Sequence, residues 1–341
     1  MQRDVAAACR GGPYDLIVVG GGVVGTGVAR DAALRGLRVL LLEQEDYGSG
    51  TTSRSSRLVH GGLRYLAHGD LRLVLQDLRE REVLLRLAPH LVRPLTFLIP
   101  LYRPSLRERL TLRAGLALYD LLSWGTSLPS PAWLGREAAL AAEPSLRAEG
   151  LAGAYRYADA QVALPERLCL ENALDAVAHG AVALNHARAV ALLREGGAVA
   201  GVRVRNLLDG GEHEARGRLV VNATGPWADL VRGLAGASDG AAPRPALRLT
   251  KGVHLVVPRA SDNALVLFSP RDGRLLFVIP WLGYSLIGTT DTDYEGDPAA
   301  VRAEPEDVRY LQEAVARLLP AEAVERVHFT TAGLRALVRQ P

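Results

Sequence analysis

The stretch Y-D-L-I-V-V-G-G-G-V-V-G, residues 14–25, decides the fold of this chain. Its first half, Asp15 to Gly20, is a short apolar run typical of a buried strand in a parallel sheet. Residues 23–35 then show the apolar spacing of a helix, which Gly36 ends. A second apolar run, R-V-L-L-L-E at residues 38–43, follows directly. Strand, glycine turn, helix and strand within about 30 residues are typical of a β-α-β unit, so an α/β fold is predicted.

The glycine turn carries the first functional motif. Gly20, Gly22 and Gly25 fit the pattern G-x-G-x-x-G. The first glycine makes the tight turn, the second lets a pyrophosphate approach the backbone, and the third lets helix and strand pack closely. Glu43 ends the second strand, where a carboxylate binds ribose hydroxyls and disfavours the 2′-phosphate of NADP. The sequence therefore predicts a dinucleotide-binding, Rossmann-like domain.

A second nucleotide-type element favours FAD over NAD as the dinucleotide. The first motif lies near the N-terminus, and N-A-T-G at residues 222–225 follows another apolar strand much later. This arrangement is typical of flavoproteins with the two-dinucleotide-binding fold, and it makes Ala223, Thr224 and Gly225 candidate cofactor contacts. The alternative for this element is a plain turn between strand and helix.

Composition excludes several classes of protein. With 341 residues, 48% hydrophobic and 23% charged, the chain has ordinary globular values and room for two domains. A net charge of +3 gives no case for nucleic-acid binding.

Cys9 and Cys169 form no C-x-x-C pair, so neither a disulfide framework nor a metal site is expected. No secretory leader and no uncharged run of about 18 residues are found, which predicts a cytoplasmic protein. Lys251 is the only lysine, which hints at a position that needs a compact point charge.

The most informative segment is T-T-S-R-S-S-R-L-V-H-G-G-L-R-Y, residues 51–65. With N-A-T-G-P-W (222–227), K-G-V-H-L-V-V-P-R (251–259) and I-G-T-T-D-T-D-Y (287–294), it resembles FAD-dependent, quinone-linked glycerol-3-phosphate dehydrogenases of the aerobic type. The motifs occur in the family's order from about Tyr14 to Leu337. The resemblance implies a D-amino-acid-oxidase-like fold, in which an antiparallel-sheet cap domain covers the substrate.

The resemblance also implies a reaction and its site. The reaction is oxidation of sn-glycerol 3-phosphate to dihydroxyacetone phosphate, with hydride passing to N5 of FAD and electrons to a quinone. The implied catalytic residues are Arg64 and Tyr65 as substrate contacts, His254 near the carbinol, and Arg335 on the phosphate. The implied cofactor contacts in the loop motif are Thr51, Thr52, Ser53, Ser55, Ser56, His60, Gly61 and Gly62. Ala189 lies where the family holds the adenine by backbone.

Elementary chemistry agrees with these roles. A phosphate dianion suits the planar fork of arginine. Oxidation of an alcohol needs a base for the hydroxyl proton, and neutral histidine suits that task. Taken alone, His254 in its apolar strand would be interpreted as a hydrogen-bonded core histidine, and Arg335 as a surface charge.

The predicted domains are interleaved. Residues 1–13 are expected to form a loose tail, residues 14–90, 150–240 and 320–341 the FAD-binding domain, and residues 91–149 and 241–319 the cap domain. Helices are predicted at 71–87, 106–123, 165–179 and 304–318. The three runs 182–193, 199–207 and 213–221 are predicted to form a β-meander.

The chain departs from the family pattern in three places. Ala336 follows Arg335 where a proline is usual, and residues 159–167 differ from the commoner V-D-D-x-R-L. A later G-G-K-x-T-T-type segment and a C-terminal helical domain are expected to be absent. Two alternatives therefore stay open: a related FAD-dependent oxidase of another 2-hydroxy or amino substrate, and a non-catalytic FAD-binding fragment.

Membrane contact is a further hypothesis, because quinone use implies it. Residues 106–124 form an amphipathic segment with Arg107, Arg109 and Arg113, which suits a helix lying on the inner face of the cell membrane. An ordinary helix of the cap domain explains the pattern equally well. The sequence leaves the oligomeric state open, with a homodimer among the options.

Overall fold

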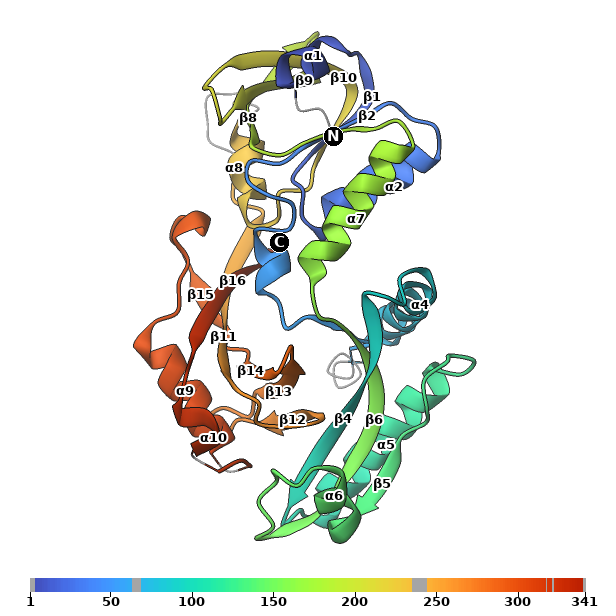
Figure 1. Ribbon diagram of the computed structural model, residues 1–341, viewed down its shortest axis with the longest axis vertical. Helices are drawn as coiled ribbons and strands as arrows, with labels where there is room; N and C mark the ends of the chain where they lie inside the picture. Colours follow the sequence, from blue (N-terminus) through green and yellow to red (C-terminus); the bar gives the residue numbers. More distant parts are fainter. Residues whose placement is uncertain (1–3, 63–68, 235–243, 317, 321, 340–341) are drawn as a thin grey trace.

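A computed structural model describes residues 4–62, 69–234, 244–316, 318–320 and 322–339 of the chain. Two β-sheets lie toward opposite ends of an elongated molecule (Figure 1). The six-stranded sheet forms the upper end of the view, and the ten-stranded sheet with its helices forms the lower part. The chain passes from one sheet to the other and back, so side chains from both sheets can meet in the middle of the molecule.

The six-stranded sheet has the order β7-β2-β1-β10-β9-β8. Its strands are β1 (Tyr14–Val19), β2 (Val39–Leu42), β7 (Val182–Leu184), β8 (Ala187–Glu195), β9 (Ala198–Asn206) and β10 (Glu212–Asn222). The first four in this order are parallel, whereas β10, β9 and β8 form an antiparallel meander. Every residue of β2 is buried, as the continuous apolar run predicted. The predicted strand, helix and strand of residues 14–43 are confirmed.

Two alanine-lined helices pack side by side against this sheet (Figure 1). They are α2 (Val23–Leu34) and α7 (Pro165–Ala178). Their buried contact residues are Ala29, Ala32 and Ala33 on α2, with Ala173 and Ala176 on α7. Small side chains let the two helices approach closely, which brings the start of α7 near the glycine turn.

The structure corrects two expectations about this half. Residues 5–10, expected in a loose tail, form helix α1 (Val5–Arg10), because Val5 and Cys9 are buried in the core of the sheet. The run 182–193 was expected to be one strand of the meander. It divides at His186, whose φ is 48°, so that β7 joins the parallel sheet beside β2 while β8 joins the meander.

The ten-stranded sheet has the order β15-β11-β14-β13-β12-β4-β6-β3, with β16 paired to β11 and β5 paired to β6. Its strands are β3 (Leu58–Val59), β4 (Val92–Tyr102), β5 (Ala132–Gly135), β6 (Leu151–Val162), β11 (Leu247–Pro258), β12 (Ala264–Phe268), β13 (Leu275–Trp281), β14 (Tyr284–Gly288), β15 (Thr292–Tyr294) and β16 (Phe329–Val338). Nearly all of its pairings are antiparallel, and β4 with β12 is the parallel exception. The predicted antiparallel cap sheet is therefore present.

Helices cover both faces of the ten-stranded sheet. On one face lie α4 (Leu71–Leu87) and α5 (Leu106–Leu122), which share a core with β4, β6 and β12. On the other face lie α6 (Arg136–Ala142), α9 (Pro305–Val315) and α10 (Glu322–Glu325). The predicted helices 71–87, 106–123 and 165–179 agree with the structure to within one residue. No helix in the described part of the chain is long and apolar enough to cross a membrane.

The predicted domain limits stay a prediction. Two strands that these limits place in the dinucleotide-binding domain, β6 and β16, pair within the ten-stranded sheet. The limits assign residues 150–162 and 329–338 to the dinucleotide-binding domain. β6 nevertheless pairs with β4 along its length, and β16 pairs with β11, both in the ten-stranded sheet. These two strands end beside the connection between the sheets, where the candidate site lies.

Candidate functional site

In the glycine turn between β1 and α2, only one of the three motif glycines borders open space. Gly20 has φ of +108°, and a methyl group on it would lie 2.5 Å from the carbonyl oxygen of Ala223. A methyl group on Gly25 would lie 1.8 Å from the carbonyl oxygen of Gly20. A methyl group on Gly22 would meet only the hydroxyl of Thr52, at 3.4 Å. The first and last of these glycines are thus required by packing, while Gly22 borders free space at the N-terminus of α2, where a pyrophosphate is bound well.

Glu43 is held in place at the carboxyl end of β2. The backbone N–H of Gly21 donates to its Oε2 at 2.6 Å, and that of Glu45 donates to its Oε1 at 2.8 Å. Burial raises the pKa of Glu43, and these backbone hydrogen bonds partly oppose the rise. Each carboxylate oxygen keeps a further lone pair for a ribose hydroxyl. The carboxylate is therefore oriented before any ligand arrives.

The loop motif begins with η1 (Thr51–Arg54), a short 3-10 helix that joins the two halves of the site. The hydroxyl of Thr52 accepts a hydrogen bond from the N–H of Val23, at the start of α2 (3.1 Å). The hydroxyl of Thr51 donates to the carbonyl of Leu334 on β16 (2.7 Å). Ser53 and Ser55 donate to backbone carbonyls within the same loop. The loop is thereby attached to the glycine turn at one side and to the cap sheet at the other.

His254 lies on β11 and forms a hydrogen bond with the end of this loop. Its Nε2 is 2.9 Å from the hydroxyl of Ser56. The side chain is almost completely buried, at 3% exposure, and its Nδ1 has no hydrogen-bond partner among the described residues. Burial first, and then the positive charges of Arg335 and Arg57, lower the pKa of His254 to about 3. The imidazole is therefore neutral at physiological pH.

Arg335 lies close to His254, on the neighbouring strand β16. Its guanidinium donates to the Thr289 hydroxyl (3.2 Å), the Thr290 carbonyl (3.1 Å) and Asp291 Oδ1 (3.3 Å). It passes over Gly252, on which a methyl group would lie 2.9 Å from Nη2. Since Gly252 and His254 are two residues apart on β11, both lie on the same face of the sheet. The structure thus brings the predicted histidine and arginine together, and leaves the arginine one-third exposed.

Arg57 is a residue of this site that sequence reasoning missed. It is buried with a φ of 59° and lies 4.6 Å above the ring of Trp281. Its guanidinium pairs with Glu166 at 3.0 Å and donates to the carbonyl of Ser53 at 2.8 Å. It therefore fixes the loop from the side of α7 and adds positive charge near His254. Glu166 and Trp281 are distant from it in the sequence, so no local signal indicated this role.

The remaining predicted site residues fall in several places. Ala223 donates its N–H to the carbonyl of Val19, beside the glycine turn, and Thr224 and Gly225 follow it into η2 (Gly225–Trp227). Ala189 lies on β8, whose first residue donates its N–H to the carbonyl of Glu43. The ring of His60 accepts the N–H of Gly62 (3.0 Å), and Gly61 is buried nearby. Arg64 and Tyr65 lie outside the described residues.

Two further observations concern the ion pair of Lys251 and the side chains that could bind a metal ion. Lys251 forms a partly buried ion pair with Asp307 (2.6 Å) at the start of α9. The ion pair joins β11 to the start of α9, and the need for a compact point charge at this position stays a prediction. In the part of the chain that the structure describes, no three His, Cys, Asp or Glu side chains gather into a group that could hold a metal ion.

Comparisons with known proteins show the family to which the chain belongs. A family model described as "FAD dependent oxidoreductase" matches residues 15–341. A glycerol-3-phosphate dehydrogenase from Synechocystis sp. is 43% identical over 335 residues, which cover 95% of this chain and 61% of that protein. An alpha-glycerophosphate oxidase from Enterococcus casseliflavus is 38% identical and covers 95% of this chain and 54% of that protein.

One solved structure is close as well. The glycerol-3-phosphate dehydrogenase from Bacillus halodurans, complexed with FAD, superposes with a TM-score of 0.77 at 32% identity. The match covers 97% of this chain and 58% of that chain. The chain thus spans little more than half the length of the relatives it matches.

Proposed function

We propose a specific reaction for this chain on the premise that it belongs to the family of FAD-dependent oxidoreductases. That membership confirms the predicted class of enzyme and FAD as the cofactor of the class. The reaction is the oxidation of sn-glycerol 3-phosphate to dihydroxyacetone phosphate. The observation that carries it is the position of His254 and Arg335 on one face of the cap sheet, beside the loop that leads to the glycine turn. A proton acceptor and a phosphate-binding group are what this substrate requires.

The residues present fit the cofactor. The open space at Gly22 and the fixed carboxylate of Glu43 suit a pyrophosphate and a ribose. Thr51 to Ser56 connect that cradle to His254, which makes this loop our candidate for the flavin-facing wall. When bound, FAD supplies the hydride acceptor.

His254 takes the hydroxyl proton of the substrate in this proposal. Its Nδ1 is enclosed, whereas its Nε2 contacts the partly exposed hydroxyl of Ser56. Nε2 is therefore the nitrogen through which a proton can enter or leave. The low pKa keeps the ring neutral, and in the tautomer with its proton on Nδ1 the nitrogen Nε2 is free to accept the hydroxyl proton.

Arg335 has two effects in this scheme. It offers a planar pair of donors to the substrate phosphate, in competition with its present partner Asp291. Its charge also helps to lower the pKa of His254. A phosphate dianion on Arg335 offsets that charge, so the basicity of His254 rises when the substrate is bound. The histidine thus becomes a better proton acceptor with substrate present.

A product assay tests the proposal. The purified chain, supplemented with FAD, is mixed with sn-glycerol 3-phosphate and a redox dye. One dihydroxyacetone phosphate should form per two electrons delivered to the dye, and glycerol and lactate should reduce the dye far more slowly. Equal turnover of a 2-hydroxy or amino acid would instead favour the related oxidase. Bound FAD with no turnover of any of these substrates would favour the non-catalytic fragment.

We propose a quinone at the membrane surface as the electron acceptor. Helix α5 supports membrane contact, because it exposes Leu106, Leu110 and Leu121 next to Arg107, and Trp124 just beyond it is 86% exposed. Apolar side chains flanked by arginines suit an interfacial helix.

Charge reversal at Arg107 and Arg113 should abolish sedimentation with anionic liposomes, while reversal of the exposed Arg218 should not. Hydrogen peroxide formed in step with substrate, in the presence of quinone, would refute the quinone acceptor.

A further inference from the structure

The carboxylate of Asp291 lies between two arginines of the cap, Arg335 and Arg274. Its Oδ1 is 3.3 Å from Nη1 of Arg335, and its Oδ2 is 3.2 Å from Nη1 of Arg274. The same nitrogen of Arg274 donates to the main-chain carbonyl of Asp291. Arg274 is held in turn by Asp272, whose Oδ2 is 3.2 Å from its Nε. The second arginine therefore holds both the backbone and the carboxylate of Asp291.

The pairing of the strands brings these side chains together. Strands β13 and β14 are antiparallel, with Phe277 opposite Gly288. Three residues beyond this pair, the register places Arg274, just before β13, opposite Asp291, just after β14. Arg335 comes from β16, two strands away from β14 across β11. The candidate phosphate-binding arginine is thus joined through one carboxylate to a residue of the connection between β12 and β13.

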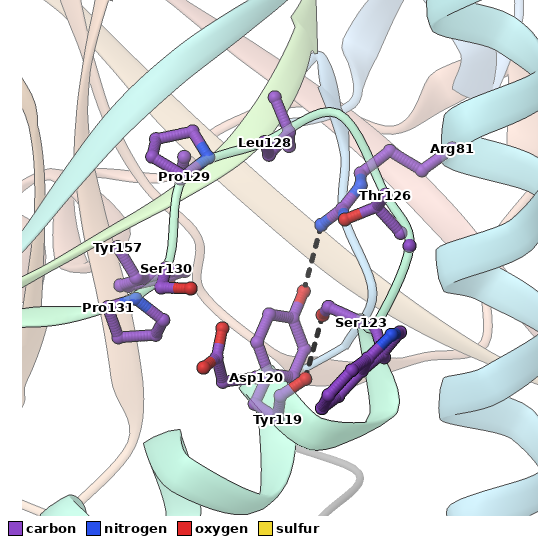
Figure 2. A pocket seen from close by; sticks show the side chains of 13 residues that line it. Arg81, Tyr119, Asp120, Ser123, Thr126, Leu128, Pro129, Ser130, Pro131 and Tyr157 are labelled. Atoms are coloured by element: carbon purple, nitrogen blue, oxygen red, sulfur yellow. Dashed lines mark hydrogen bonds between the residues drawn. The ribbon is translucent and has the colours of Figure 1, made fainter.

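Access to solvent distinguishes this group from a second arginine–carboxylate group of the cap. Arg81 and Asp159 are 1% and 2% exposed, and Tyr119 donates its hydroxyl to the same carboxylate. Figure 2 shows the guanidinium of Arg81 reaching toward that hydroxyl. The two arginines and the carboxylate at Asp291 are instead 33–40% exposed. An anion from solution can therefore take the place of Asp291 on Arg335, whereas the buried group is closed to such an exchange.

The second arginine determines the cost of this exchange. A partly buried carboxylate that loses its only cation is destabilised, and that cost opposes the binding of a competing anion. Here Oδ2 of Asp291 keeps Arg274 when Oδ1 loses Arg335, so the carboxylate is not left without a cation. Because solvent screens these partly exposed pairs, the expected effect on affinity is modest, about fivefold.

We propose that Arg274 is a positioning residue for phosphate recognition and that Asp291 sets the affinity of Arg335 for the phosphate. In the empty site, Asp291 holds the guanidinium of Arg335 in place. When the phosphate binds, Arg274 retains Asp291, and Arg335 is released to the substrate. The inference rests on the proposed function and deepens it, because it adds two residues that control the affinity for a phosphorylated substrate.

The substitutions Arg274→Gln and Asp291→Asn test the inference, because they should act in opposite directions. Without Arg274, Asp291 depends on Arg335 alone and competes more strongly with the phosphate, so KM for sn-glycerol 3-phosphate should rise about fivefold. Asp291→Asn removes the competing charge, so KM should fall about threefold. The value of kcat should stay within about twofold in both variants, because phosphate binding is common to the ground state and the transition state.

Two exposed ion pairs nearby provide matched controls. Arg271, in the same β12–β13 connection as Arg274, pairs with Glu306 on α9 at 3.0 Å. Asp293, two residues after Asp291 in the sequence, pairs with Arg248 at 2.6 Å. Arg271→Gln and Asp293→Asn should each leave KM within about twofold of the parent protein.

The double substitution Arg274→Gln/Asp291→Asn separates positioning from a general loosening of the cap. Once the carboxylate is removed, the loss of Arg274 should change KM by less than about twofold. An equal rise of KM with and without the carboxylate would overturn the inference. A raised KM in Asp291→Asn would overturn it as well, as would equal KM values in Arg274→Gln and Arg271→Gln.

A binding measurement distinguishes failure of the inference from failure of the proposed function. The dissociation constant of inorganic phosphate, measured on the FAD-loaded chain by phosphorus NMR, should change among these variants in the same directions as KM. A phosphate affinity that neither Arg274→Gln nor Asp291→Asn changes would overturn the inference. If the affinities follow the expected pattern in a protein that does not oxidise sn-glycerol 3-phosphate, the proposed function fails while the phosphate-binding role of the two residues is retained.

Discussion

Replacement of Arg335 by glutamine is the sharpest perturbation of the site. The change removes the positive charge and the forked donors but keeps a polar, shorter side chain. A phosphate bound by two charge-assisted hydrogen bonds loses about 1.5–3 kcal/mol for each. The phosphate competes with the present partner Asp291, which offsets part of this gain. We therefore take the lower end, about 3 kcal/mol, and expect kcat/KM to fall about 10²-fold.

The assay is anaerobic stopped-flow measurement of flavin reduction by sn-glycerol 3-phosphate and by glycerol. Arg335→Gln should lose its preference for the phosphorylated alcohol, while the slow rate with glycerol stays within about threefold of the parent. Arg248→Gln is the matched control, because Arg248 is an exposed arginine of β11 that pairs with Asp293. Its rates should not change. The reasoning is refuted if Arg335→Gln slows both alcohols equally, or if it slows sn-glycerol 3-phosphate no more than Arg248→Gln does.

Three further predictions concern the cofactor cradle, the histidine and the lysine. Gly22→Ala should weaken FAD binding at least tenfold in a fluorescence titration, because its methyl group enters the open approach, whereas Gly27→Ala, with nothing within 4 Å, should bind FAD normally. The pKa of His254 is depressed in the folded protein, so its contribution to stability is present above pH 6.5 and is lost as the pH falls toward 3. Between pH 7 and pH 4.5, the free energy of unfolding in urea titrations should therefore fall by roughly 2–3 kcal/mol less in His254→Gln than in the parent protein. An equal fall in both proteins would contradict a buried neutral imidazole. Lys251→Met leaves the buried Asp307 with the N–H of Glu304 as a donor but without its cation, and should cost about 3 kcal/mol in stability with KM unchanged; a raised KM with parental stability would place the lysine in the substrate site.

The parts of the fold that were predictable are those with local signals. The glycine turn and its flanking apolar runs encode the β-α-β unit directly, since Gly20 and Gly25 are required by close contacts within that unit or beside it. Strand β4 was not predicted, because Pro94 and Pro100 interrupt its apolar pattern. The structure accommodates both prolines because β12 pairs with β4 only at Phe97 and Leu98, so donors are not needed along both sides of the whole strand.

The candidate site shows the same division between local and distant signals. His254 and Arg335 were identified from a resemblance, and their neighbourhood in space follows from the pairing of β11 with β16. The contact between Ser56 and His254 joins residues 198 positions apart, and no sequence pattern encodes it. Arg57 was missed for the same reason, since Trp281 and Glu166 reach it only in the folded chain.

One measurement tests the central claim most directly. The 341-residue chain is loaded with FAD under anaerobic conditions, sn-glycerol 3-phosphate is added, and the visible absorbance of the flavin is followed. The account predicts bleaching with this substrate and none with lactate, and bleaching should vanish when His254 is replaced by asparagine while FAD stays bound. A bound flavin that keeps its colour in the presence of sn-glycerol 3-phosphate would contradict the account.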